Sequence, residues 1–172
     1  FLLHELEKII SRRKWAAKKY DRIVAKFPST KEIMDIFRNM SDRNLMIIVI
    51  EETIVLCIAV ILAIYGGLKM NTPYAYPLIA LSWGFGIHLI FHLVHSAFLT
   101  IYTPGMFTSV VLMPYFFLTA ADMCVHFSLT ENLIFAFITS LNLLLLTLPL
   151  TYGTIQYEQK LLHPSSIFIN AL

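Results

Sequence analysis

Three histidines lie in the segment HLIFHLVH, whose other residues are large and apolar. His88, His92 and His95 are spaced i, i+4 and i+7, so on an α-helix their side chains fall within roughly 40° of one another. Imidazole nitrogens are common ligands of zinc and iron, and they also carry protons near neutral pH. A column of imidazoles in an apolar helix therefore indicates a metal site, a proton site or a polar ligand site inside a helix bundle.

Carboxylates accompany histidine in two other apolar segments. The chain opens with FLLHELEKII, in which His4 and Glu7 are three residues apart, and the pair Glu51 and Glu52 interrupts a long apolar run. An ionisable side chain among lipid tails costs several kcal/mol, so each such residue is a candidate functional residue. Adjacent helical residues diverge by about 100°, so only one of Glu51 and Glu52 is expected to face the core, and the sequence leaves open which one.

The composition is that of a membrane protein. Of 172 residues, 58% are hydrophobic and only 14% are charged, with a mean hydropathy of +0.71, whereas soluble domains have about a quarter charged residues. We expect an all-α, polytopic transmembrane helix bundle that forms one domain over residues 1–172. The apolar runs predict about five membrane helices, at about 1–11 (truncated), 45–65, 77–101, 106–127 and 129–152, followed by a tail at 153–172.

Charge predicts the orientation of these helices. Ten of the 13 Lys and Arg residues lie in the connector 12–43, and by the positive-inside rule this connector and the C-terminus are cytoplasmic. The stretch PSTKEIMDIF predicts a short cytoplasmic or interfacial helix at about 31–40. The basic charge is a topological signal, so we expect membrane lipids and no nucleic acid as partners; the oligomeric state stays open.

The ionisable residues can be placed by depth. At about 1.5 Å per residue from the cytoplasmic ends of three predicted helices, six side chains lie roughly 5 to 13 Å deep: His4, Glu7, Glu51, Glu52, His92 and His95. His88 lies at roughly 20 Å by the same count, outside this layer, as an attendant or a relay. The six could ligate one metal ion or two. Without metal, they could form a proton or ligand site, or a structural polar network.

Several segments resemble one family, the HXXEE-motif integral membrane proteins of bacteria. They are FLLHELEKI, AKFP followed by MS, EET in the second span, and HLVHSAFLTIYTPGMFTSVVLMP. The resemblance implies a small multi-helix protein of the bacterial cytoplasmic membrane, whose His and Glu residues have suggested an enzyme without an established reaction. It points to the same six residues. Lys8 stands at the position of the signature's second Glu.

We therefore expect a metal-dependent integral-membrane enzyme that acts on a lipid or amphipathic substrate near the cytoplasmic leaflet. With zinc it would be a hydrolase in which Glu7, Glu51 or Glu52 acts as general base, and with two iron ions an oxidase or hydroxylase. The alternative is a non-enzymatic transporter, ligand-binding or immunity-type protein that uses the same layer to bind a proton or a ligand.

Overall fold

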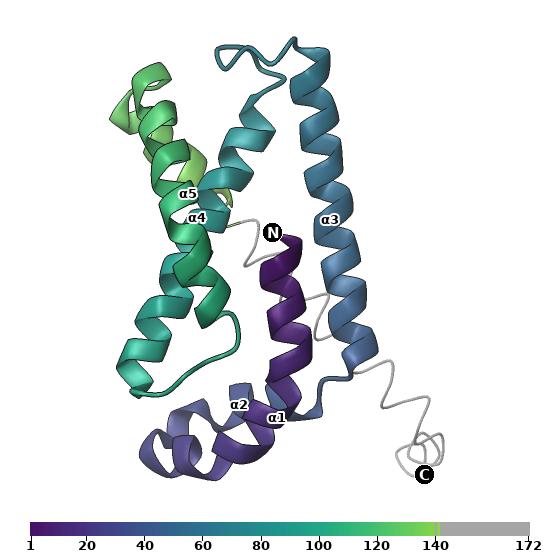
Figure 1. The fold of residues 1–172 in the computed structure, drawn as a ribbon, viewed down its shortest axis with the longest axis vertical. Helices are drawn as coiled ribbons and strands as arrows, with labels where there is room; N and C mark the ends of the chain where they lie inside the picture. Colours follow the sequence, from purple (N-terminus) through teal and green to yellow (C-terminus); the bar gives the residue numbers. More distant parts are fainter. Residues whose placement is uncertain (140, 142–172) are drawn as a thin grey trace, which may run out of the picture.

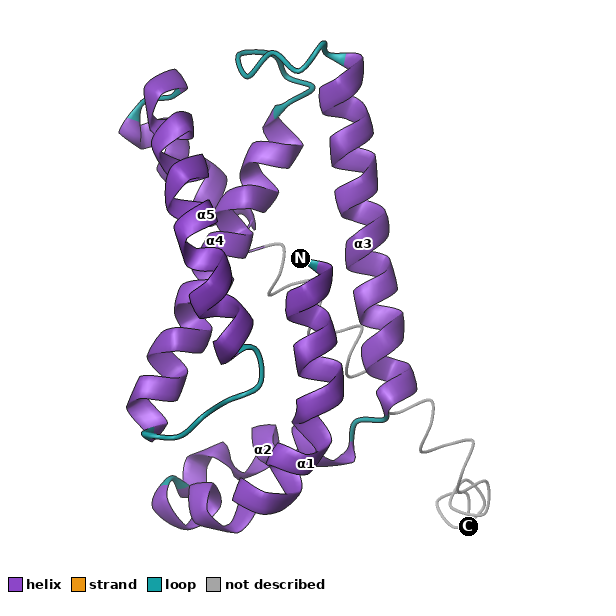
Figure 2. Ribbon diagram, viewed as in Figure 1, coloured by secondary structure: helices purple, strands orange, loops and turns teal. Residues whose placement is uncertain are grey.

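The regular structure of the described residues is helical throughout. The computed structural model describes residues 1–139 and 141. Its helices follow in the order α1 (Leu2–Lys26), η1 (Pro28–Thr30), α2 (Lys31–Asn39), α3 (Asp42–Tyr65), α4 (Tyr76–Leu99) and α5 (Met106–His126), and a short apolar helix, Leu129–Thr139, comes after them. Loops join the helices, and α1 stands between α3 and the pair α4 and α5 (Figures 1 and 2). The predicted all-α fold is confirmed.

Within residues 1–139 and 141, three helices, α3, α4 and α5, are long and apolar enough to cross a membrane. Their large apolar side chains point outward; Ile61 is 64% exposed and Phe91 61% exposed, as expected of helices whose solvent is lipid. The observed ranges agree with the predicted spans at 45–65, 77–101 and 106–127 to within a few residues. Of the span predicted at 129–152, Leu129–Thr139 is helical; the remainder and the tail at 153–172 lie outside the described residues.

Helix α1 differs from its prediction. We expected a membrane helix that ends near residue 11 and a connector beyond it, whereas one helix continues to Lys26. The sequence has no proline or glycine between Phe1 and Pro28, so nothing breaks the helix once the apolar run ends. Its second half is amphipathic: Ile23 is buried in a cluster with Met34 of α2 and Leu99 of α4. The basic connector is thus a packed helical element.

Two contacts hold α1 in the middle of the bundle. The guanidinium of Arg12, which is buried, lies 3.0 Å from a carboxylate oxygen of Asp42 in the first turn of α3. The indole nitrogen of Trp15 donates a hydrogen bond of 2.6 Å to the carbonyl oxygen of Tyr102, in the turn between α4 and α5. The middle of α1 is thereby fixed against the start of α3 on one side and against the turn between α4 and α5 on the other.

Candidate metal centre

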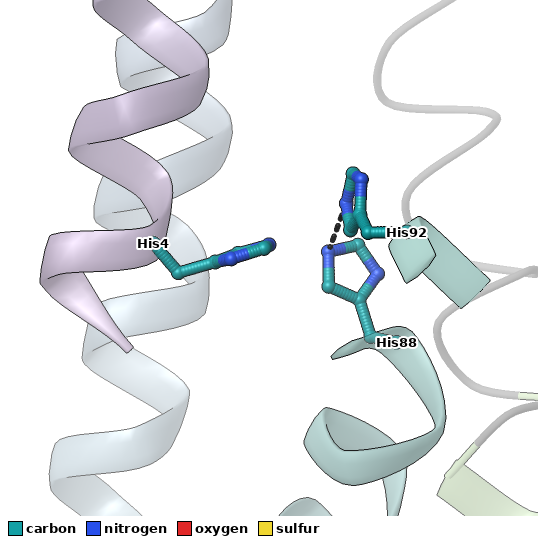
Figure 3. Close-up of side chains that lie close together, drawn as sticks. All are labelled: His4, His88 and His92. Atoms are coloured by element: carbon teal, nitrogen blue, oxygen red, sulfur yellow. Dashed lines mark hydrogen bonds between the residues drawn. The ribbon is translucent and has the colours of Figure 1, made fainter. Parts of the chain in front are cut away.

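Three histidines from two helices converge inside the bundle. One ring nitrogen from each of His4, His88 and His92 lies within 4.8 Å of the other two. The Nε2 atoms of His88 and His92, one turn apart on α4, are 3.1 Å from each other. Figure 3 shows the ring of His4, from α1, pointing toward these two rings. We call these residues the histidine triad.

One pair of the triad is spaced like two ligands of one metal ion, and all three nitrogens lie within 4.8 Å of one another. Two imidazole nitrogens at about 2.05 Å from a tetrahedral zinc ion lie roughly 3.3 Å apart, and the pair in α4 is at 3.1 Å. The side chain of His4 is fully buried, and its Nε2 atom has no hydrogen-bond partner among the described residues. Buried polar atoms are normally paired, so an unpaired nitrogen that faces two imidazoles is well suited to bind a cation.

The turn between α4 and α5 closes one side of the triad. Gly105 has a φ of +91°, and a Cβ atom placed on it would lie 2.9 Å from Cε1 of His4 and 2.9 Å from Cε1 of His92. Glycine is therefore required here twice, for its backbone conformation and for the close approach of the turn to both rings. The sequence did not predict this contact between the turn and the triad.

Glu7 joins α1 to the start of α5 instead of pointing into the triad. Its carboxylate accepts hydrogen bonds from the backbone nitrogens of Phe107 (3.2 Å) and Thr108 (2.7 Å), and from the hydroxyls of Thr108 (2.5 Å) and Tyr102 (2.5 Å). An anion is favourable at the N-terminus of a helix, whose first N–H groups have no partner within the helix. Partial burial and the bond to Glu7 raise the pKa of Tyr102 above its ordinary value.

The other predicted ligands lie apart from the triad. Glu51 and Glu52 on α3 are half-buried, and Glu52 lies within electrostatic reach of Glu5 and Lys8 on α1. The ring of His95 packs against that of Phe91, with 5.7 Å between ring centroids. Among the described residues, the structure brings together His4 and His92 of the six predicted side chains. It does not bring Glu7, Glu51, Glu52 or His95 within the same ligand distance.

His88 is the member that the depth count left out. Depth was counted at about 1.5 Å per residue from the cytoplasmic end of each predicted helix, with all these ends taken at one level. On that basis His88 lies deeper in the membrane than His4. In the structure the ring centroids of His4 and His88 are 5.1 Å apart, because the first turn of α1 reaches His88 as well as His92. The i, i+4 spacing of His88 and His92 in the sequence is the signal that places both rings on one face of α4.

A buried ion pair on α1 was not predicted. Glu5 is 3% exposed, and the ammonium of Lys8 lies 2.7 Å from its carboxylate. Lys8 is thus held inside the bundle by a neighbour on its own helix. With Arg12 these residues are spaced i, i+3 and i+7 and form one charged stripe on α1. The stripe reaches Asp42 and Glu52 of α3, and Lys8 also lies within electrostatic reach of the three histidines of the triad. The spacing could have revealed this stripe.

Residues 1–120 match a family described as a protein of unknown function with HXXEE motif. The chain belongs to the HXXEE family. No curated protein and no solved structure matches it. By spacing, the histidine of the HXXEE motif is His4 and its first glutamate is Glu7, and Thr108 joins these two side chains. The second glutamate position holds Lys8, which pairs with Glu5.

Proposed function

We propose that this member of the HXXEE family is a metal-dependent integral-membrane hydrolase whose zinc ion is held by His4, His88 and His92. The observation that carries the proposal is the convergence of three imidazoles from two helices, one of them with a buried and unpaired Nε2 atom among the described residues. Zinc held by three imidazoles keeps a fourth position open for water or substrate, which is the arrangement of catalytic zinc sites.

The donor set favours zinc over a two-iron centre. Two-iron sites in helix bundles use several carboxylates from facing helices, and none of the predicted carboxylates joins the described triad. Both oxygens of Glu7 already accept hydrogen bonds from the α4–α5 turn and the start of α5. Glu52 lies toward the charged stripe of α1 instead. A single ion with three nitrogen ligands is the simplest occupant.

The surroundings of the triad favour a lipid or amphipathic substrate. His88 and His92 are half-buried on α4, and the neighbouring side chains Phe91 and Val94 are about as exposed as lipid-facing residues elsewhere, at 61% and 60%. The turn at Gly105 that touches the triad also contacts Trp15, where the basic half of α1 begins. By the positive-inside rule this end is cytoplasmic, so the site would face the inner leaflet of a bacterial cytoplasmic membrane.

One observation supports a second candidate. A non-enzymatic transporter or ligand-binding protein would use a second group of charged side chains beside the triad. The ion pair of Glu5 and Lys8, together with Glu52, is such a group. Charged groups inside a membrane bundle are typical of ion and proton pathways. In this reading the triad binds a cation that passes through the protein instead of a resident catalytic ion.

Metal analysis of the purified protein in lipid nanodiscs tests the first proposal. We expect one zinc ion per chain, its loss in His92→Ala, and retention in His126→Ala, which alters a histidine on α5 that pairs with Asp122. Release of fatty acid or headgroup from the nanodisc lipids should require zinc and stop on chelation. A parent protein without stoichiometric metal would overturn the metal site, and a zinc-loaded protein that hydrolyses no lipid would favour the transporter.

A further inference from the structure

Thr108 lies between the HXXEE glutamate and the triad. Its Oγ1 atom is 2.5 Å from Oε2 of Glu7 and 2.9 Å from Nδ1 of His4. The backbone nitrogen of Thr108 also donates to Glu7, at 2.7 Å. This residue is thus fixed at the first turn of α5 and contacts both the histidine and the first glutamate of the motif.

The direction of each hydrogen bond in this chain follows from counting protons. The carboxylate of Glu7 takes four donors, from Tyr102, Phe107 and twice from Thr108, and an ionised carboxylate is an acceptor only. The single hydroxyl proton of Thr108 therefore goes to Glu7, at 2.5 Å, and not to its other acceptor, the carbonyl oxygen of Gly105, at 3.3 Å. The Oγ1 atom is left with lone pairs toward His4, so Nδ1 of His4 must carry the proton and donate it to Thr108.

This arrangement decides the tautomer of His4. A neutral imidazole has one N–H group, so a proton on Nδ1 leaves Nε2 as a lone pair. That atom is the buried one without a partner among the described residues, and the ring points toward His88 and His92 (Figure 3). The opposite tautomer would direct an N–H group at the position that a cation would occupy.

We propose that Thr108 is a positioning residue of the histidine triad. Its hydroxyl donates to Glu7 and accepts from Nδ1 of His4, and so directs the Nε2 lone pair of His4 toward a divalent transition-metal ion. The metal part of this inference rests on the proposed function, while the tautomer part does not. Groups that hold the second nitrogen of a ligating histidine typically contribute 10- to 100-fold to metal affinity.

Three variants separate positioning from a structural role. Thr108→Val keeps the shape of the side chain and removes the hydroxyl, Thr108→Ser keeps the hydroxyl, and Ser109→Ala removes a neighbouring buried hydroxyl that donates to Gly105. In nanodiscs, zinc titration against a chelating dye should show affinity that is about 10- to 100-fold weaker for Thr108→Val and near the parent value for the other two. Equal affinity in Thr108→Val and parent, or an equal loss in Ser109→Ala, would overturn the proposal.

The tautomer is measured independently in metal-free protein. In ring-¹⁵N-histidine-labelled samples, with His4 assigned by comparison with His4→Gln, we expect His4 to carry its proton on Nδ1 in the parent and in Thr108→Ser, and to populate both tautomers in Thr108→Val. A parent that binds zinc but carries the proton on Nε2 in the metal-free state would refute this inference and leave the proposed function standing. A parent with the Nδ1 proton that binds no zinc would refute the proposed function instead.

Discussion

Replacement of Gly105 by alanine tests the contact between the turn and the triad. Holding a non-glycine residue at a φ of +91° costs about 1–2 kcal/mol. The new Cβ atom would also lie 2.9 Å from Cε1 of both His4 and His92, where ordinary contacts begin at 3.4 Å. The rings or the turn must therefore move by about 0.5 Å, more than the ~0.2 Å tolerance of metal–ligand distances.

Gly67→Ala is the matched control for this variant. Gly67 has a φ of +72° and open space around its Cβ position, so alanine meets similar backbone strain there without touching the triad. We expect Gly67→Ala to lower the free energy of unfolding in detergent by about 1–2 kcal/mol, and Gly105→Ala to lower it by at least as much, because its Cβ atom also meets the two rings. Only Gly105→Ala should also weaken zinc binding, by about tenfold or more, as measured by competition with a chelating dye. Parent-like zinc affinity in Gly105→Ala, or an equal loss in Gly67→Ala, would refute the reasoning.

Two further predictions concern the position of α1. Arg12→Met should lower the free energy of unfolding by about 1.5–3 kcal/mol, whereas Arg13→Met, which removes the exposed second partner of Asp42, should cost at most about 1 kcal/mol; similar losses would show that the buried pair has no special role. Glu7→Gln removes the charge that caps α5 and should lower the free energy of unfolding by about 1–2 kcal/mol. It should also shift the tryptophan emission, because Glu7 holds Tyr102, whose carbonyl oxygen accepts the hydrogen bond of Trp15. The exposed Glu32→Gln should leave both quantities unchanged. An unshifted emission spectrum in Glu7→Gln would contradict the role of Glu7 in docking the turn.

The fold was largely predictable because lipid imposes a simple length rule on apolar helices. This rule placed α3, α4 and α5 to within a few residues of their observed ends. It failed for α1, since the apolar run stops near Ile10 while the helix continues as an amphipathic element whose buried face packs on α2. Hydropathy indicates where the apolar, lipid-facing part of a helix ends. The helix itself continues until a residue such as Pro28 breaks it.

The site was predictable in part. Residue type and spacing selected six side chains, of which the structure brings together His4 and His92. Assigning depth along separate helices requires their relative heights, which tertiary packing determines. The depth count therefore excluded His88, whose ring centroid is 4.6 Å from that of His92. The place of Glu7 at the N-terminus of α5, and of Thr108 beside it, follows from contacts about one hundred residues apart, which no local pattern contains.

The most direct test of the histidine triad compares His88→Ala with His95→Ala. Both variants remove one imidazole from α4, but only His88 belongs to the triad with His4 and His92. Metal analysis of the two purified proteins in nanodiscs should find that His88→Ala has lost its zinc and that His95→Ala retains one zinc ion per chain. The reverse result, with zinc lost in His95→Ala and kept in His88→Ala, would contradict the account.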